Sequence, residues 1–212
     1  MRQLWGPLGW MTLHSISLNY PETPSLEDKT ILKEYLDAFA ECISCPTCKS
    51  HFMGLYRTYT QQNVNWSSSR QELFLFIARA HNSVNRRIDK PVLQTVSDCL
   101  ETIKLNSKNT SLYEFRQKYI QYLLRNWSAQ HDGQGFMAMH NVKVMQKINN
   151  EYWNLRETDI SEVKLEEAEV VKPIEDRTPI PRISYNIPTF SRGTVPLVGF
   201  RIKGGKLQLG SK

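Results

Sequence analysis

The sequence predicts an all-α protein, in which a small helical bundle is followed by a helical extension and an irregular tail. Apolar residues recur at spacings of three and four through much of residues 1–155, as on the buried faces of amphipathic helices. Polar or proline-containing breaks separate these stretches, and no internal repeat is present. At 212 residues the chain is long for one compact domain and short for two. One domain with an appendage is therefore expected.

Local signals mark where the helices of the bundle begin. Ser25 can cap the second helix, with Asp28 three residues later. Pro46 suits the first turn of the third helix, because its missing N–H is not needed there. Five helices with short loops form a bundle. They are expected over residues 4–20 with a break near Gly6 and Pro7, from Ser25 to Phe39, from Pro46 to Tyr59, from a cap within Ser67 to Ser69 to Val84, and from Val92 to Ile103.

Beyond the bundle the apolar spacing resumes after a polar break. Residues 112–127 and 145–155 predict two further amphipathic helices, with a loop over residues 131–135. A marginal hairpin is expected around Gly204 and Gly205. We therefore expect three segments, namely a domain over residues 1–105, a helical extension over residues 106–158 and a basic tail containing Pro and Gly over residues 159–212.

Charge is concentrated in the tail. The formal net charge is +6, and residues 173–212 contribute seven Lys or Arg against two acidic residues. Such a tail could contact an acidic protein surface, nucleic acid or an anionic membrane, or it could be a solvated extension. No stretch of about 18 apolar residues and no signal core occur, so a cytoplasmic protein that is neither secreted nor membrane-spanning is expected. A secreted disulfide framework is not expected there.

Two cysteines form the sequence Cys45-Pro-Thr-Cys48 at the expected start of the third helix. Sulfur atoms one helical turn apart are within reach of a disulfide bond. Backbone N–H groups and the helix dipole stabilise a thiolate at this end of a helix, which makes its attack on disulfides faster. The pair is therefore a candidate redox centre.

Metal binding is the alternative interpretation of these cysteines. With Cys42 and His51 they form the pattern C-x2-C-x2-C-x2-H, which could supply ligands to zinc or to an iron–sulfur cluster. However, residues at three-residue steps on one helix lie along a stripe and do not readily surround a single ion. The spacing therefore favours redox chemistry over a metal site.

Two other segments present pairs of side chains one helical turn apart. Trp10 and His14 lie in WGPLGWMTLH, and His81 and Asn85 lie in HNSVNRRIDKP. Such pairs suit a flat aromatic cofactor, with Lys90 available for its phosphates. Each residue alone is more simply interpreted as part of the core, but the three segments together favour a cofactor site.

The patterns WGPxxWxxLH, CxxCxxHF and HNxVNxxxxKP together resemble the Erv/ALR family of FAD-linked sulfhydryl oxidases over about residues 1–105. The resemblance implies a small helical bundle that binds FAD, commonly as a homodimer. It implies that Cys45 exchanges with a protein dithiol, and that Cys48 passes electrons to FAD, which reduces molecular oxygen to hydrogen peroxide. The residues implied to contact FAD are Trp5, Gly6, Trp10, His14, His81, Asn82, Val84, Asn85 and Lys90.

The chain departs from the cellular members of that family. Only Cys99 lies beyond the KP element, where those members usually have a structural cysteine pair, and the tail lacks a shuttle pair. We therefore expect direct oxidation of substrate thiols, with Cys42 and Cys99 either buried or bonded to each other. The pared-down domain with its extension resembles members encoded by large DNA viruses, which form disulfides of virion proteins in the host cytoplasm. A metal-binding, virion scaffold or interaction module with structural cysteines is the alternative.

Overall fold

The computed structural model describes residues 2–167, 171–175, 202–203 and 206–207, with side chains described between residues 6 and 175. Residues 1–178 form one compact unit, and residues 179–212 form a second. The first unit is all-α in its described part, as the sequence predicts. Its helices are α1 (Arg2–Asn19), α2 (Leu26–Cys42), α3 (Pro46–Gln62), α4 (Arg70–Arg87), α5 (Val96–Asn106), α6 (Leu112–Ser128), α7 (Gly133–Glu151) and the 3-10 helix η1 (Trp153–Leu155).

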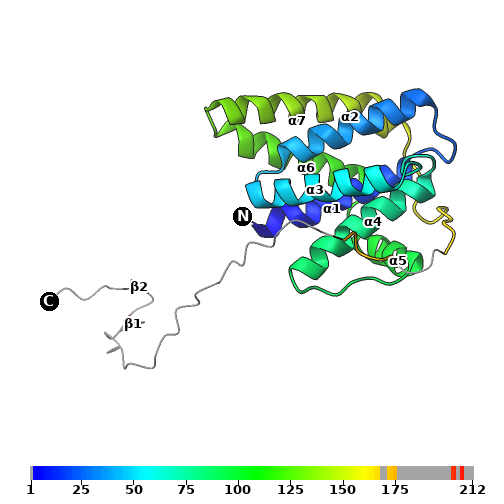
Figure 1. Ribbon diagram of the computed structural model, residues 1–212. Helices are drawn as coiled ribbons and strands as arrows, with labels where there is room; N and C mark the ends of the chain where they lie inside the picture. Colours follow the sequence, from blue (N-terminus) through cyan, green and yellow to red (C-terminus); the bar gives the residue numbers. More distant parts are fainter. Residues whose placement is uncertain (1, 168–170, 176–201, 204–205, 208–212) are drawn as a thin grey trace. The chain divides into compact units, whose positions relative to one another are not determined.

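Helix α1 lies at the centre of the first unit (Figure 1). It packs against α4 and also against α6, while α7 runs alongside both α2 and α6. Helix α3 connects α2 to α4, and α5 lies at the edge opposite α7. The extension helices α6 and α7 are therefore packed directly on the first two helices of the bundle.

The predicted caps of the bundle helices are confirmed. Ser25 and Asp28 form a capping box at the start of α2, in which each side chain accepts a hydrogen bond from the other residue's backbone N–H. Ser69 caps α4 by accepting a hydrogen bond from the N–H of Glu72. Cys45 is the N-cap residue of α3, and Pro46 is its first residue. Short-range capping chemistry therefore places the first residues of three helices.

The helices differ from prediction in several places, since α2 to α5 each end three residues later than expected and α7 begins twelve residues earlier. Helix α1 continues through Pro7, where a break was expected, and the proline leaves the helix without the backbone hydrogen bond that an N–H at this position would donate. Helix α5 begins at Val96, four residues later than Val92, because Thr95 forms its capping box. Helix α7 begins within the expected 131–135 loop, because Asp132 caps its first turn.

The core of the first unit has two parts. The larger cluster contains residues from the four helices α1, α2, α3 and α4 and from both extension helices, α6 and α7. Within it, Tyr119 of α6 is fully buried against Phe39 of α2. The second cluster lies between α1, α4 and α5, where Val163 and Val171 also pack. Burial of this apolar surface is the main force that holds α6 and α7 on the bundle.

The second unit contains a short antiparallel hairpin. Strand β1 (Ile202–Lys203) pairs with β2 (Lys206–Leu207), as the sequence predicts. The two glycines expected between the strands, Gly204 and Gly205, lie outside the described residues, as does most of the basic tail.

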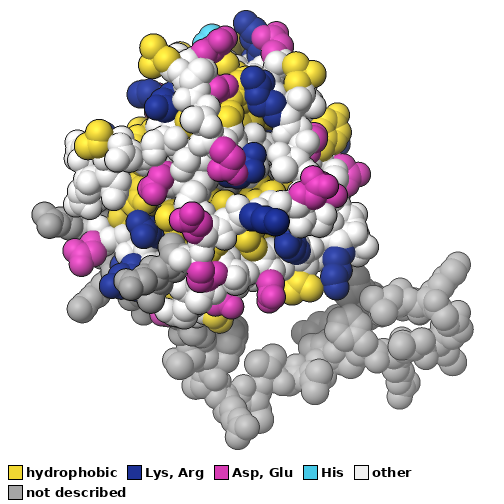
Figure 2. All heavy atoms as spheres, turned by 90° about the vertical axis from the view of Figure 1, so that its right-hand side faces the viewer, with side chains coloured by type: hydrophobic (Ala, Val, Ile, Leu, Met, Phe, Trp, Pro, Cys, Tyr) yellow, Lys and Arg dark blue, Asp and Glu magenta, His cyan; other side chains and the backbone are white. Residues whose placement is uncertain are grey.

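The visible face of the first unit carries Lys, Arg, Asp and Glu side chains interspersed with one another (Figure 2). Neither sign of charge dominates this face, consistent with the concentration of net charge in residues 173–212. No helix in the described part of the chain is long and apolar enough to cross a membrane.

Candidate redox and cofactor site

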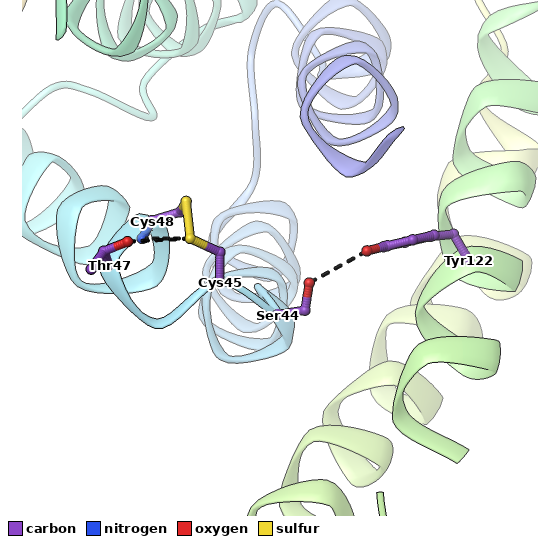
Figure 3. The surroundings of a disulfide bond; sticks show 5 residues. All are labelled: Ser44, Cys45, Thr47, Cys48 and Tyr122. Carbon is purple, nitrogen blue, oxygen red and sulfur yellow. Dashed lines mark hydrogen bonds between the residues drawn. A yellow bond between two sulfur atoms is a disulfide. The ribbon is translucent and has the colours of Figure 1, made fainter. Parts of the chain in front are cut away.

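Cys45 and Cys48 form a disulfide bond at the start of α3 (Figure 3). Their Cα atoms are 5.2 Å apart, which is the separation given by one helical turn. The Sγ of Cys45 accepts a hydrogen bond from the backbone N–H of Cys48 over 3.3 Å, and it lies 3.3 Å from the hydroxyl of Thr47. The predicted pairing is therefore present, and the first sulfur lies at the positive end of the helix dipole.

The two sulfur atoms have different surroundings. Both cysteines are half-buried, but Cys48 packs against the larger core cluster. Cys45 precedes the helix as its N-cap residue. The two sulfur atoms are therefore not equivalent, since Cys48 contacts the core and Cys45 lies at the helix start.

Cys42 and His51 do not join this pair in a metal site. Cys42 is buried on α2, and its thiol donates a hydrogen bond to the carbonyl of Ala138 over 3.5 Å. Burial raises the pKa of the Cys42 thiol to about 12, which opposes the thiolate form that a metal requires. Among the residues that the structure describes, no cluster of three or more His, Cys, Asp or Glu could hold a metal ion.

Cys42 and Cys99 are both free, buried thiols. Cys42 lies in the larger core cluster and Cys99 in the second cluster. Burial also raises the pKa of Cys99 to about 12. The sequence left open whether Cys42 and Cys99 are buried or bonded to each other. In the structure both thiols are buried, and they are not bonded to each other.

The two predicted cofactor segments meet through their histidines. His14 Nε2 on α1 lies 3.1 Å from His81 Nδ1 on α4, so one ring donates a hydrogen bond to the other. The ring of Trp10 stacks on His81, with centroids 4.4 Å apart and planes 7° apart. The sequence predicted pairs within each helix, and the structure joins the helices into one aromatic cluster.

Burial keeps both histidines neutral near pH 7. It lowers the pKa of His14 well below the usual value, with a further contribution from His81. It lowers the pKa of His81 to about 4, aided by the positive charge of Lys90. The Nδ1 atom of His14 is buried and has no hydrogen-bond partner within the described structure. That nitrogen is therefore a polar group available to a bound molecule.

A small cavity lies beside these histidines, between α1, α4 and α5. Its walls combine the two imidazoles with Met11, Ala78 and Ile103, among other side chains. Neutral imidazoles on a mostly apolar wall fit an aromatic ring that carries hydrogen-bonding atoms. They suit a metal ion less well, since carboxylates and thiolates are absent from the rest of this wall, where Cys99 contributes a protonated thiol.

Asn82 has a structural function that its sequence motif does not reveal. It is buried, and its amide nitrogen donates to the carbonyls of Leu93 and Val171 over 2.8 Å each. Its amide oxygen accepts a hydrogen bond from the N–H of Leu93 over 3.1 Å. Asn82 therefore ties two distant segments to α4. No local pattern in the sequence indicates a contact with Val171, which lies 89 residues away.

The other predicted cofactor residues lie along the same two helices. Val84 and Asn85 are half-buried on α4, and Lys90 is exposed just beyond its end. The backbone N–H of Lys90 donates to the carbonyl of Asn85 over 2.8 Å, which folds the chain back toward the helix. Gly6 lies in the first turns of α1 with open space around it. The side chain of Trp5 lies outside the described residues.

Comparisons with known proteins match the part of the chain that carries this site. The model of the Erv1/Alr family matches residues 8–106. A protein of Invertebrate iridescent virus 3 named FAD-linked sulfhydryl oxidase 096R is 35% identical over 92 residues, which are 43% of this chain and 60% of its own. The mitochondrial FAD-linked sulfhydryl oxidase ERV1 of Saccharomyces cerevisiae is 33% identical over 86 residues, 41% of this chain and 43% of its own.

A third relative is the FAD-linked sulfhydryl oxidase of African swine fever virus, 26% identical over 89 residues, 42% of this chain and 71% of its own. The chain thus spans less than two thirds of the iridescent virus and yeast proteins. No solved structure matches the chain significantly. The matched segment contains the disulfide at the start of α3 and the histidine pair between α1 and α4. Through residues 8–106, just under half of its length, the chain is similar to the Erv1/Alr family.

Proposed function

We propose that the protein is an FAD-dependent sulfhydryl oxidase, which forms disulfides in protein substrates and transfers the electrons to molecular oxygen. The observation that carries this proposal is the Cys45–Cys48 disulfide at the N-terminus of α3, within the segment that matches the Erv1/Alr family. The names of the matched relatives support the same activity and cofactor.

The first step is an exchange of disulfide bonds at Cys45. A substrate thiolate attacks Cys45 Sγ, so a substrate–Cys45 bond forms while the bond to Cys48 breaks and Cys48 leaves as a thiolate. The second substrate thiolate then attacks the substrate sulfur of this mixed disulfide and releases Cys45. The substrate is oxidised by two electrons, and the Cys45–Cys48 pair is reduced by two. The N–H of Cys48, which points at Cys45 Sγ, stabilises the released Cys45 thiolate.

The residues of the histidine cluster would hold FAD. Trp10 and His81 offer stacked rings, and His14 offers the unpartnered nitrogen. Lys90 supplies positive charge for the phosphates, and Asn85 holds the turn that carries it. When bound there, FAD would supply the two-electron transfer from the cysteine pair to oxygen, which would be reduced to hydrogen peroxide. Because burial lowers the pKa of both rings, His14 and His81 remain neutral near pH 7 and add no positive charge of their own to this site.

The partners follow from this chemistry and from the relatives. Substrates would be proteins with two reduced cysteines, and oxygen would be the acceptor. Virion proteins in the host cytoplasm are the proposed targets, because three of the relatives come from iridescent, African swine fever and mimivirus genomes. A homodimer is the proposed assembly by family resemblance, and the basic tail would contact an acidic surface.

The proposal is tested with the purified full-length protein. We expect a yellow preparation with flavin absorbance that consumes oxygen when dithiothreitol is added and releases one hydrogen peroxide per disulfide formed. Cys45→Ala and Cys48→Ala should each lower oxygen uptake by at least about 10³-fold, because no disulfide remains to exchange. Cys99→Ala is the control for the loss of a thiol outside the disulfide. Because Cys99 also lines the cavity beside the histidines, its oxygen uptake is compared at equal flavin content.

A folded, colourless protein that consumes no oxygen would contradict the proposal. Stoichiometric zinc or iron in such a preparation would favour the metal-binding alternative. Loss of activity in a flavin-loaded Cys99→Ala equal to that in Cys48→Ala would show that the assigned pair is wrong.

A further inference from the structure

Residues 42–44, which comprise the last residue of α2 and the start of the connection to α3, lead directly into Cys45. These residues are held by contacts from the extension helices, which lie beyond the segment that matches the family. The indole N–H of Trp127 on α6 donates to the carbonyl of Cys42 over 3.0 Å. The thiol of Cys42 donates to the carbonyl of Ala138 on α7 over 3.5 Å. Both α6 and α7 therefore bind the segment from which the redox pair starts.

A third contact lies nearer the disulfide. The hydroxyl groups of Ser44 and Tyr122 are 3.4 Å apart, with Tyr122 reaching across from α6 (Figure 3). The ring of Tyr122 stacks on that of Tyr119, with centroids 6.4 Å apart and planes 15° apart. Tyr119 is itself fully buried against Phe39 of α2. The position from which Tyr122 meets Ser44 is therefore fixed by the core.

The strength of these contacts follows from their burial. Trp127 and Cys42 are 3% and 0% exposed, so water cannot replace the hydrogen bond between them. A hydrogen bond in such surroundings is electrostatically stronger than one in water, and the loss of one partner leaves a buried polar group unsatisfied. The Trp127 contact is therefore the main anchor, and the longer Tyr122 contact is the weaker one.

The anchored segment determines where the sulfur of Cys45 lies. Ile43 and Cys45 both have extended backbone conformations, which turn the chain from the end of α2 into the first turn of α3. In this arrangement Cys45 is the N-cap residue, and its Sγ faces the N–H of Cys48. If residues 42–44 moved, the reduced sulfur would lose that N–H and the helix dipole, and its thiolate would be less stable.

We propose that the α6–α7 extension positions the redox pair, with Trp127 and Tyr122 holding residues 42–44 so that Cys45 Sγ stays at the N-terminus of α3. These two are positioning residues, since they act on Cys45 through the connecting segment. The consequence for turnover rests on the proposed oxidase function. The consequence for the Cys45 thiol does not, because it concerns the reactivity of the sulfur alone.

The experiment measures that reactivity in the full-length protein after reduction. Alkylation of each cysteine by iodoacetamide is followed across pH by peptide mass spectrometry, in wild type, Trp127→Phe, Tyr122→Phe and Tyr119→Phe. Tyr119→Phe is the matched control, because it removes a phenol hydroxyl on the same helix that has no partner in the described structure. Labelling of buried Cys42 shows whether a variant has opened or unfolded.

We expect the alkylation rate of Cys45 at pH 7 to fall about fivefold in Trp127→Phe and about two- to threefold in Tyr122→Phe, since one hydrogen bond is lost in each. The pH midpoint of the reaction should rise in both variants, and Tyr119→Phe should match wild type. In oxygen uptake, the KM for dithiothreitol should rise in the same order while flavin absorbance stays constant.

The proposal is overturned if Tyr122→Phe and a folded Trp127→Phe alkylate at Cys45 as wild type does at every pH. It is equally overturned if Tyr119→Phe slows the reaction as much as Tyr122→Phe. If Cys42 becomes labelled in Trp127→Phe, that variant has opened or unfolded. The alkylation rates of Cys45 in Tyr122→Phe, Tyr119→Phe and wild type then decide the proposal. If wild type consumes no oxygen, the proposed oxidase function fails, while the alkylation rates still decide whether the extension positions Cys45.

Discussion

His14 and His81 share one hydrogen bond in a buried site, and this arrangement makes the folded protein sensitive to acid. The pKa of each ring is lowered in the folded protein, mainly by burial. In the unfolded chain a histidine takes up a proton near pH 6.5. The stabilisation from the neutral pair is therefore complete above pH 6.5 and is lost as the pH falls toward the folded pKa of His81, about 4.

We expect the free energy of unfolding to fall by about 1.4 kcal/mol per pH unit for each histidine between pH 6 and pH 4.5. Urea unfolding measured across this range gives the slope. His81→Phe keeps a flat ring against Trp10 but removes one titrating group, so its slope should be about half that of the histidine pair. Equal slopes for wild type and His81→Phe would show that the histidines are not the source of the acid sensitivity.

At the scale of elements, the two glycines in the first turn of α7 differ in what surrounds them. A Cβ atom at Gly135 would lie 2.4 Å from the carbonyl oxygen of Gln130, whereas a Cβ atom at Gly133 would have no atom within 4 Å. Backbone cannot move aside as a flexible side chain can. Gly135 therefore lets the loop before α7 fold back closely over the helix start, where Asp132 caps the N–H of Gly135 over 2.7 Å.

Gly135→Ala should lower the free energy of unfolding by about 1–3 kcal/mol, because the loop or the helix start must shift. Gly133→Ala is the matched control and should raise it by about 0.5–1 kcal/mol, because alanine favours the helix and meets no neighbour. Thermal unfolding followed by circular dichroism tests both variants. The same sign of change in both would contradict the structural explanation.

The features that could be predicted from sequence are those set by neighbours along the chain. Ser25 and Ser69 mark helix starts because a cap acts within three residues, and Pro46 marks one because it suits a first turn. The CxxC pair is predictable for the same reason. The contact between His14 and His81 depends on how α1 packs against α4, which apolar spacing alone does not specify.

Long-range hydrogen bonds explain the remaining differences. The late start of α5 follows partly from Asn82, which holds Leu93 in the preceding segment through two hydrogen bonds. The resemblance implies that Asn82 contacts the cofactor, which stays a prediction, and the structure adds that its amide binds backbone groups of Leu93 and Val171. Likewise, the apolar spacing in α6 indicates that one face of the helix is buried. It does not indicate that Trp127 donates a hydrogen bond to the segment before Cys45.

At the scale of the whole molecule, a buried arginine joins residues 8–106, which match the Erv1/Alr family model, to the helical extension. Arg116 of α6 is 0% exposed. Its guanidinium donates to Ser15 of α1, to Asn149 of α7 over 2.8 Å and to the carboxylate of Glu157. A fourth hydrogen bond of the guanidinium reaches Asn154 over 3.2 Å. Because a buried cation is costly unless it is neutralised, these groups must be assembled together as the unit folds.

Glu157→Gln should therefore destabilise the whole first unit rather than one end of it. The glutamine amide keeps an oxygen that can accept from Arg116, but it removes the negative charge that compensates the arginine. We expect the free energy of unfolding to fall by about 1–3 kcal/mol. This is less than for a fully buried ion pair, because the Glu157 side chain is 37% exposed. Glu151→Gln is the matched control, since its ion pair with Lys147 is exposed on both sides and should contribute about 0.5 kcal/mol or less. Urea unfolding followed by tryptophan fluorescence and by helical circular dichroism should give coincident transitions, shifted together by Glu157→Gln. Two separated transitions, or a loss no larger than that of the control, would show that the bundle and its extension fold independently of Arg116.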